Sequence, residues 1–314
     1  MTLELSFRNW DQESDRPFDL FVATCGYEPR ATHATKLLQD RILHLDVLDY
    51  SRGHVLGYDA NFEYFSSLGS VIPTEPAVAA EQQYYAQMRD SLGPRHLGRA
   101  HVGIDVSSCD RQRMANLVRA TERLARETSI DVTFLYSLGD FDSTLEADDL
   151  PVMINEAVVG FEGWSSDPAL PVTCVVGLGY ERRMALAAVE TLEPALTAAF
   201  IATNTESRFE DRVTQINIEI IGSDVTPVLR YDIASPVPTL ALLDSYVRNA
   251  LDGNRVVLVP LGPKLFALAC YLVAIVEGPE VSVWRVSADE SGDEQPRLAA
   301  GPVVGLTVRF PGPA

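Results

Sequence analysis

The chain has 314 residues, of which 46% are hydrophobic and 22% charged, so it contains enough apolar material for about two globular cores. Its formal net charge is −19 at pH 7, which argues against sequence-independent nucleic-acid binding, because that affinity comes mainly from Lys and Arg on phosphates. The acidity still permits a small anionic ligand held by a few local arginines. No apolar run reaches the length of a membrane span, so we expect no membrane partner.

The N-terminal residues lack the basic and apolar regions of a signal peptide, and the four cysteines form no C-x-x-C pair. We therefore expect a cytoplasmic protein with buried free thiols. No P-loop, metal-ligand Cys/His cluster or nucleophile elbow is present, so the sequence identifies neither a metal nor a cofactor.

The first half of the chain alternates predicted strands and helices. Apolar runs predict strands at 18–24, 43–48, 70–72, 101–106 and 131–136. Helices are expected at 30–39, 77–91 and 110–127, and residues 52–67 form a polar, aromatic loop or helix. This alternation predicts a parallel sheet covered on both faces.

The second half repeats the pattern. Strands are expected at 171–176, 198–202, 225–231, 255–259 and 280–285, and helices at 182–192, 238–250 and 264–276. Residues 58–64 of the first half and their counterpart 208–212 form either a cover over the site or a solvated helix face. Residues 287–296 form a charged loop, and the run 303–310 is a candidate for an added edge strand. We assign 1–150 to the first repeat, 151–170 to a linker or strap, and 171–314 to the second repeat.

A repeated motif supports a tandem duplication. Residues 26–30 read Gly-Tyr-Glu-Pro-Arg, and residues 179–183 read Gly-Tyr-Glu-Arg-Arg, at an offset that also superimposes other apolar segments. At the same offset, 104–111 lies over 257–264. The predicted fold is therefore α/β, with two tandem Rossmann-like halves, parallel sheets and pseudo-two-fold internal duplication.

Both repeated motifs leave the carboxyl ends of predicted strands. In an open parallel sheet, ligands bind where the strand order reverses, which usually lies between the first and fourth strands. Each motif also opens a helix, whose free N–H groups favour an anion. The two motifs of each half should therefore meet at one site.

The residue types at this predicted site suit an anionic or hydroxyl-rich ligand. Glycine permits close backbone approach, Arg and Lys pair with phosphate or carboxylate, and Ser binds ligand oxygens or caps a helix. The expected ligand-binding residues are Gly26, Tyr27, Arg30, Ser107, Ser108, Arg111, Gly179, Tyr180, Glu181, Arg183 and Lys264. The first hypothesis is thus binding or sensing of an anionic, nucleotide-derived small molecule.

Two other hypotheses remain open. Glu28 and Asp105 are candidate catalytic residues if the protein is a hydrolase or transferase that acts on a nucleotide or glycosidic bond. Alternatively, the chain is a structural subunit with a protein partner. A purely structural reading also exists, in which Glu28 pairs with Arg30 to order the loop and residues 107–110 merely cap a helix.

The duplicated plan resembles the CRISPR-associated Rossmann-fold (CARF) sensors, and more so their fused two-copy relatives, the SAVED domains. The residues that carry this resemblance are Asp105 to Arg111, Val259 to Lys264, and the closing strand Val281 to Trp284. The resemblance implies binding of a cyclic or linear oligonucleotide signal in an antiviral-defence setting.

Overall fold

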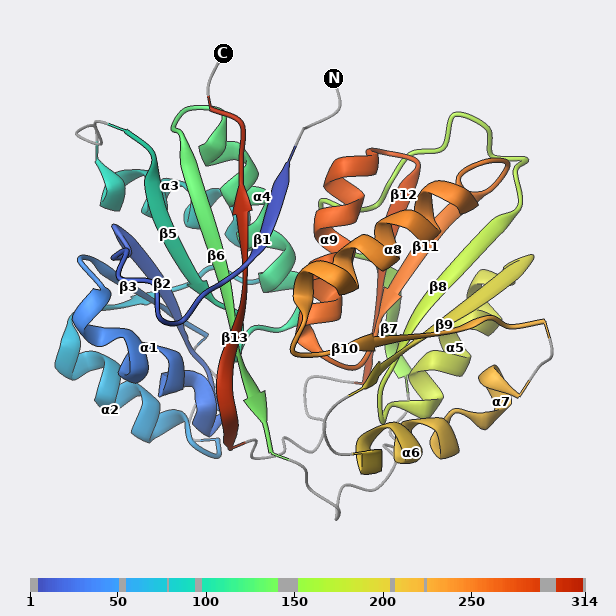
Figure 1. Ribbon diagram of the computed structural model, residues 1–314, viewed down its shortest axis with the longest axis horizontal. Coiled ribbons are helices and arrows are strands. Elements are labelled where there is room, and N and C mark those ends of the chain that lie inside the picture. The colour runs from blue at the N-terminus through green and yellow to red at the C-terminus, as the bar shows by residue number, and fades with distance from the viewer. Residues whose placement is uncertain are drawn as a thin grey trace. The chain divides into compact units, whose positions relative to one another are not determined.

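The computed structural model describes residues 5–50, 55–77, 79–93, 98–140, 152–203, 207–222, 225–288 and 298–312. The chain divides into two units, each built on its own sheet (Figure 1). The first unit extends to Asp140 and also takes in the C-terminal strand, and the second unit comprises the segment between them.

The first unit contains a seven-stranded sheet in the order β1-β13-β6-β5-β2-β3-β4. Its strands are β1 (Ser6–Asn9), β2 (Leu20–Cys25), β3 (Leu45–Asp49), β4 (Val71–Pro73), β5 (Ala100–Asp105), β6 (Ile130–Gly139) and β13 (Ala299–Arg309). Its helices are η1 (Pro29–Thr32), α1 (His33–Leu38), η2 (Gln39–Arg41), α2 (Tyr58–Leu68), α3 (Ala80–Leu92) and α4 (Arg111–Ala125).

The second unit contains a six-stranded sheet in the order β10-β9-β8-β11-β12-β7. Its strands are β7 (Val152–Ala157), β8 (Val172–Leu178), β9 (Leu196–Thr203), β10 (Val228–Asp232), β11 (Arg255–Pro260) and β12 (Val281–Ala288). Its helices are α5 (Arg182–Leu192), α6 (Ser207–Ile216), α7 (Ile218–Ile221), α8 (Pro236–Ala250) and α9 (Lys264–Glu277).

The parallel strands of both sheets follow one order. Reading from β4 to β6 and from β10 to β12, the third parallel strand comes first, followed by the second, first, fourth and fifth. Two tandem Rossmann-like halves are therefore present, as the sequence predicted. In each half the strand order reverses between the first and fourth parallel strands, β2 and β5 in one unit and β8 and β11 in the other.

Burial explains why the central strands read as continuous apolar runs. Every residue of β2 and of β5 is buried. In Figure 1, α1 and α2 lie on one face of the first sheet, and α3 and α4 lie on the other. Helix α3 packs against α4, and in the second unit α8 packs against α9. Strands covered on both faces bury both sets of side chains, so they lose the alternation typical of half-exposed strands.

The sheet edges differ from the sequence prediction. Strand β13 covers most of the run 303–310, but it pairs antiparallel with β6 and is covered on its other side by β1, so it is not an edge strand. This places the end of the predicted 171–314 repeat in the first sheet. Strand β7, in the predicted 151–170 strap, pairs antiparallel with β12. Most of the charged loop at 287–296 lies outside the described residues.

Candidate functional site at the reversal of strand order

The two motifs of the first unit meet where β2 and β5 end. A Cβ atom placed on Gly26 would lie 2.1 Å from the Ser108 Oγ and 3.1 Å from its Cβ, so any larger residue would displace the Ser108 side chain. The Asn61 side chain fixes the same loop, because its Nδ2 donates to the carbonyl oxygens of Gly26 and Glu28, both at 2.9 Å. The predicted meeting of the two motifs is confirmed in this unit.

Arg30 is committed to internal contacts. Its Nε donates to Glu28 Oε2 at 2.6 Å, and its Nη1 donates to the Tyr136 hydroxyl at 3.1 Å and the Ser137 carbonyl at 2.9 Å. The Arg30 and Glu28 side chains are 2% and 9% exposed, so this is a buried ion pair. Burial alone would lower the pKa of Arg30, but Tyr136 and Glu28 more than offset it and hold that pKa above its usual value. The structural reading of this pair is thus the one observed.

Asp105 belongs to a second buried network. Its Oδ1 accepts hydrogen bonds from the Ser107 backbone N–H at 2.9 Å and the Ser107 hydroxyl at 2.5 Å. The Ser107 Oγ in turn accepts from the Ser137 N–H at 2.8 Å. The hydroxyl oxygens of Ser108 and Ser137 are buried and have no hydrogen-bond partner among the described residues.

The first turn of α4 is capped by a carboxylate of the chain itself. Asp110 is its N-cap, and Asp110 Oδ1 accepts from the Arg113 N–H at 2.7 Å. Arg113 also pairs with Asp110 through its guanidinium, which lies 4.1 Å from the centroid of the Tyr50 ring. Arg111, the predicted ligand residue, is partly exposed at the start of this helix, and Tyr27 is partly exposed after β2. The Asp110 carboxylate therefore already accepts an N–H of the first turn of α4 that a bound anion would use.

In the second unit, the two motifs meet through their backbones. A Cβ atom on Gly179 would lie 2.6 Å from the Cα of Gly262, and a Cβ on Gly262 would lie 2.6 Å from the Leu178 carbonyl oxygen. Gly262 also has φ +72°, the left-handed region that favours glycine. The backbones of the two loops are therefore in direct contact.

The strand pairing corrects the sequence alignment of the two halves. Val22 lies opposite Ile104, and Val175 lies opposite Leu258. Since Val22 corresponds to Val175, Leu258 corresponds to Ile104 and not to Asp105. The second-half counterpart of Ser108 is therefore Gly262, which explains why these two residues face the glycine of the first motif in their respective units.

The second unit leaves two acceptor oxygens unsatisfied beside Gly179. A Cβ on Gly179 would lie 2.2 Å from Glu181 Oε2, and this oxygen is buried with no hydrogen-bond partner among the described residues. Asn217 repeats the role of Asn61, because its Nδ2 donates to the Gly179 carbonyl at 2.8 Å. The Asn217 Oδ1 is likewise buried without a partner in the described part of the chain.

The charged residues of the second motif also differ from those of the first. Arg183, the counterpart of Arg30, is exposed, whereas its neighbour Arg182 pairs with Glu219 at 2.6 Å. Tyr180 is partly buried against the second core. Glu181 thus keeps the carboxylate of the first motif without the buried arginine that neutralises Glu28.

Helix α9 begins without a side-chain cap. Pro263 is its N-cap and forms no cap hydrogen bond, and partly exposed Lys264 is its first residue. In contrast to α4, no carboxylate from its own N-cap occupies this helix start. The backbone N–H groups of a helix start and the positive end of the helix dipole favour an anion there.

Sequence reasoning missed Asn61, Asn217 and Arg113. Asn61 lies within α2, and Asn217 lies between α6 and α7, so neither adjoins the motif whose loop it holds. The one available signal was their recurrence at nearly the same distance from each glycine motif, but a single matching residue in two polar helices carries little weight.

The cysteines and the candidate metal ligands give no further site in the described part of the chain. All four cysteines are buried thiols outside any disulfide, and burial together with Asp49 raises the pKa of Cys25 to about 12. Among the described residues, no group of three or more His, Cys, Asp or Glu side chains is placed to hold a metal ion. In the same part of the chain, no helix is both long and apolar enough to cross a membrane.

Comparison with known proteins identifies no family. No protein-family model matches the chain, and no curated protein matches it. Among solved structures, the chain is similar to the crystal structure of a universal stress protein from Archaeoglobus fulgidus DSM 4304, with 10% sequence identity and a TM-score of 0.26. That similarity covers 90% of this chain and 100% of the other. At this TM-score it has no bearing on function.

Proposed function

We propose that the protein binds an anionic, nucleotide-derived small molecule at the carboxyl ends of β8 and β11, around Gly179, Gly262 and Lys264. The observation that carries this proposal is the uncapped start of α9 beside two glycine backbones in contact. In the first unit, the corresponding helix start is capped by Asp110.

The phosphate of the ligand would occupy the start of α9. Backbone N–H groups at a helix N-terminus form an anion site, and glycine at the preceding position lets a phosphate approach the backbone closely. Lys264 places a positive charge on the first residue of the helix, where the dipole alone makes a cation unfavourable by about 0.3–1 kcal/mol. An anion bound at that position reverses the sign of this effect.

The sugar of the ligand would satisfy the two acceptors beside Gly179. Glu181 Oε2 and Asn217 Oδ1 need hydrogen-bond donors, and an unsatisfied buried acceptor costs roughly 1–3 kcal/mol. Ribose hydroxyls are donors of the required kind. Together with a phosphate at α9, they favour a nucleotide over a simple anion.

The first unit offers a weaker case. Arg30 is neutralised by Glu28, and Asp105 accepts hydrogen bonds from Ser107. No specific observation favours catalysis by Glu28 or Asp105, and that hypothesis stays a sequence prediction. The resemblance to CARF and SAVED domains adds cyclic oligonucleotides to the ligands worth testing, and an antiviral role would depend on one of them binding.

Isothermal titration calorimetry tests this proposal. The ligands are ADP, a cyclic oligoadenylate and pyrophosphate, and the variants are Lys264→Ala and Glu181→Ala. A charge-assisted hydrogen bond contributes about 1.5–3 kcal/mol, so Lys264→Ala should weaken every ligand that binds by roughly tenfold or more. Glu181→Ala should weaken the nucleotides and leave pyrophosphate unchanged, because only the nucleotides carry sugar hydroxyls.

The matched control is Arg248→Ala. Arg248 is in the same unit, in the last turn of α8, and pairs with Asp244 and Glu277. The Arg248→Ala substitution removes one positive charge, as Lys264→Ala does, and should leave the affinities for all three ligands unchanged. If no ligand binds the folded wild-type protein, or if Lys264→Ala and Arg248→Ala have equal effects, the proposal is refuted.

A further inference from the structure

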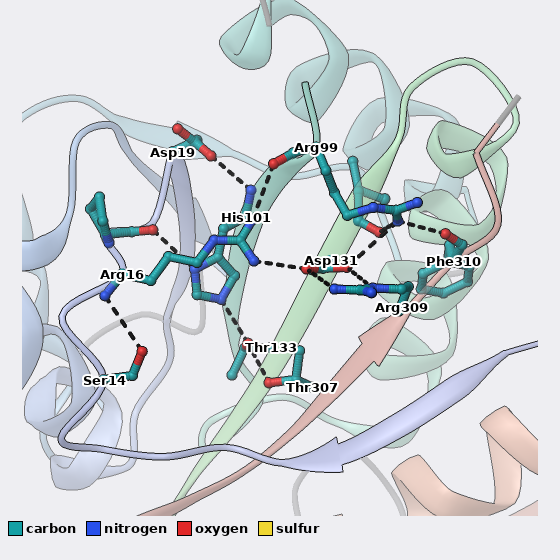
Figure 2. Close-up of polar contacts among 12 residues, drawn as sticks. Ser14, Arg16, Asp19, Arg99, His101, Asp131, Thr133, Thr307, Arg309 and Phe310 are labelled. Atoms are coloured by element: carbon teal, nitrogen blue, oxygen red, sulfur yellow. Dashed lines mark hydrogen bonds and ion pairs between the residues drawn. The ribbon is translucent and has the colours of Figure 1, made fainter. Parts of the chain in front are cut away.

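Three arginines from distant parts of the chain converge on one buried carboxylate in the first unit (Figure 2). Asp131, near the start of β6, has a side chain that is 1% exposed. Arg16 comes from the segment before β2, Arg99 directly precedes β5, and Arg309 ends β13. The cluster therefore lies at the amino ends of β5 and β6, at the opposite end of these strands from Ser107 and Ser137.

These arginines bind both oxygens of the Asp131 carboxylate. Arg16 Nη1 lies 2.7 Å from Oδ2, and Arg309 donates from Nε to Oδ1 at 3.0 Å and from Nη2 to Oδ2 at 3.3 Å. Arg99 Nη1 lies 3.5 Å from Oδ1 and donates to the carbonyl oxygens of Ile130 and Phe310 at 2.8 and 2.7 Å. Arg309 alone, directly opposite Asp131 across the strands, would form a complete ion pair.

One carboxylate, Asp131, balances only one of the three arginine charges that it pairs with. Arg8 of β1 is exposed, lies opposite Thr307 of β13 and adds another cation. Partly exposed Asp19 accepts from the His101 backbone N–H at 2.7 Å. The His101 ring is held between the Pro17 carbonyl and the Thr133 hydroxyl, each at 2.9 Å (Figure 2). Four arginines of the described chain, Arg8, Arg16, Arg99 and Arg309, thus gather at this end of the sheet, in a protein whose overall charge is −19.

The arginines also retain hydrogen-bond donors. Arg16 Nε, Arg99 Nε and Nη2, and Arg309 Nη1 have no hydrogen-bond partner among the described residues. The side chains of Arg16, Arg99 and Arg309 are 36%, 30% and 55% exposed, so a ligand can reach them from solvent. Converging guanidinium groups with spare N–H donors match the oxygens of a tetrahedral oxyanion.

We propose that Arg16, Arg99 and Arg309 form a second anion site, which binds a phosphoryl group, either free phosphate or the phosphate of a larger molecule. Asp131 serves as a positioning residue that holds the three guanidinium groups together. This site is separate from the one around Lys264 and does not depend on it.

Thermal unfolding in increasing phosphate tests the site, with sodium chloride keeping the ionic strength constant. The background is Lys264→Ala, which removes the contribution of the other proposed site. In this background, phosphate should raise the Tm in a saturable manner. Adding Arg309→Gln should raise the apparent Kd for phosphate at least tenfold, whereas adding Arg248→Gln should leave it unchanged. Repeating the titration with AMP distinguishes free phosphate from a phosphate monoester.

Because Arg309→Gln also loses its bonds to Asp131, each shift is measured against the baseline Tm of the same variant. Arg16→Lys keeps the charge and loses the planar fork, and it should weaken phosphate binding by an intermediate factor. The proposal is overturned if phosphate gives no saturable shift in the Lys264→Ala background. It is also overturned if Arg309→Gln and Arg248→Gln respond alike to phosphate. Neither result affects the nucleotide titrations at Lys264.

Discussion

Replacing Arg30 with methionine should strongly destabilise the first unit. The Arg30 side chain is 2% exposed and pairs with Glu28, whose side chain is 9% exposed. The substitution leaves the Glu28 carboxylate buried without its cation, and removes the donor to the Tyr136 hydroxyl and the Ser137 carbonyl. Breaking a buried pair by removing one partner costs about 3–5 kcal/mol. We therefore expect a loss of that size in the free energy of unfolding.

The duplication supplies the control for this experiment. Arg183→Met changes the corresponding residue of the second unit, which is exposed, and exposed substitutions usually change stability by less than about 0.5 kcal/mol. Because the chain has two units, native-state hydrogen exchange is the suitable assay, with the amides of β2 reporting on the first unit and those of β8 on the second. A cost below about 1 kcal/mol for Arg30→Met, or equal costs for the two variants, would refute the reasoning about a buried pair in one unit alone.

Three further predictions follow from individual contacts. In thermal unfolding, Gly262→Ala should destabilise the second unit more than Gly278→Ala, because only the new Cβ at residue 262 meets a backbone oxygen. Both positions have positive φ, which costs roughly 1–3 kcal/mol of strain in each variant, so equal losses would contradict the prediction. Asn61→Ala should lower the free energy of unfolding of the first unit by about 2–4 kcal/mol, because two carbonyl oxygens lose their donor. An unchanged midpoint of urea unfolding would contradict this and would show that water replaces the amide. Burial lowers the pKa of His101 from 6.5 to about 4, so its ring should titrate near pH 4 by NMR, and a midpoint near 6.5 would contradict a buried neutral ring. The free energy of unfolding that the neutral ring contributes should be lost as the pH falls from 6.5 through 4.

The sequence was sufficient to predict the central architecture. Continuous apolar runs identified the parallel strands, and the repeated glycine motif identified the duplication and the loops that meet at the reversal of strand order. These features depend on local composition and on a repeat, both of which can be read directly. The first-motif contact between Gly26 and Ser108 followed from the same topology.

The added strands were harder to predict because their pairing partners are remote in sequence. Strand β13 pairs with β6 although most of the second unit separates them, and the short strand β1 has no strong apolar pattern. The Asp131 cluster likewise joins Arg16, Arg99 and Arg309, which no local pattern connects.

The roles of the charged motif residues depend on burial, which their spacing does not encode. Arg30 and Arg183 occupy the same motif position, yet the first is buried on Glu28 and the second is exposed. The sequence presented both as equivalent ligand contacts. The offset between the two halves also grows by one residue before the second motif, so the counterpart of Ser108 is Gly262 and not Leu261, which the sequence alignment had suggested.

The most direct test of the proposed function is a crystal structure of the protein grown with ADP, or with whichever nucleotide binds most tightly in the titrations. Our account predicts phosphate oxygens bound to the backbone N–H groups at the start of α9, close to Gly262 and Lys264. It also predicts sugar hydroxyls hydrogen-bonded to Glu181 and Asn217. A nucleotide bound elsewhere, with Glu181 and Asn217 still lacking donors, would contradict the account.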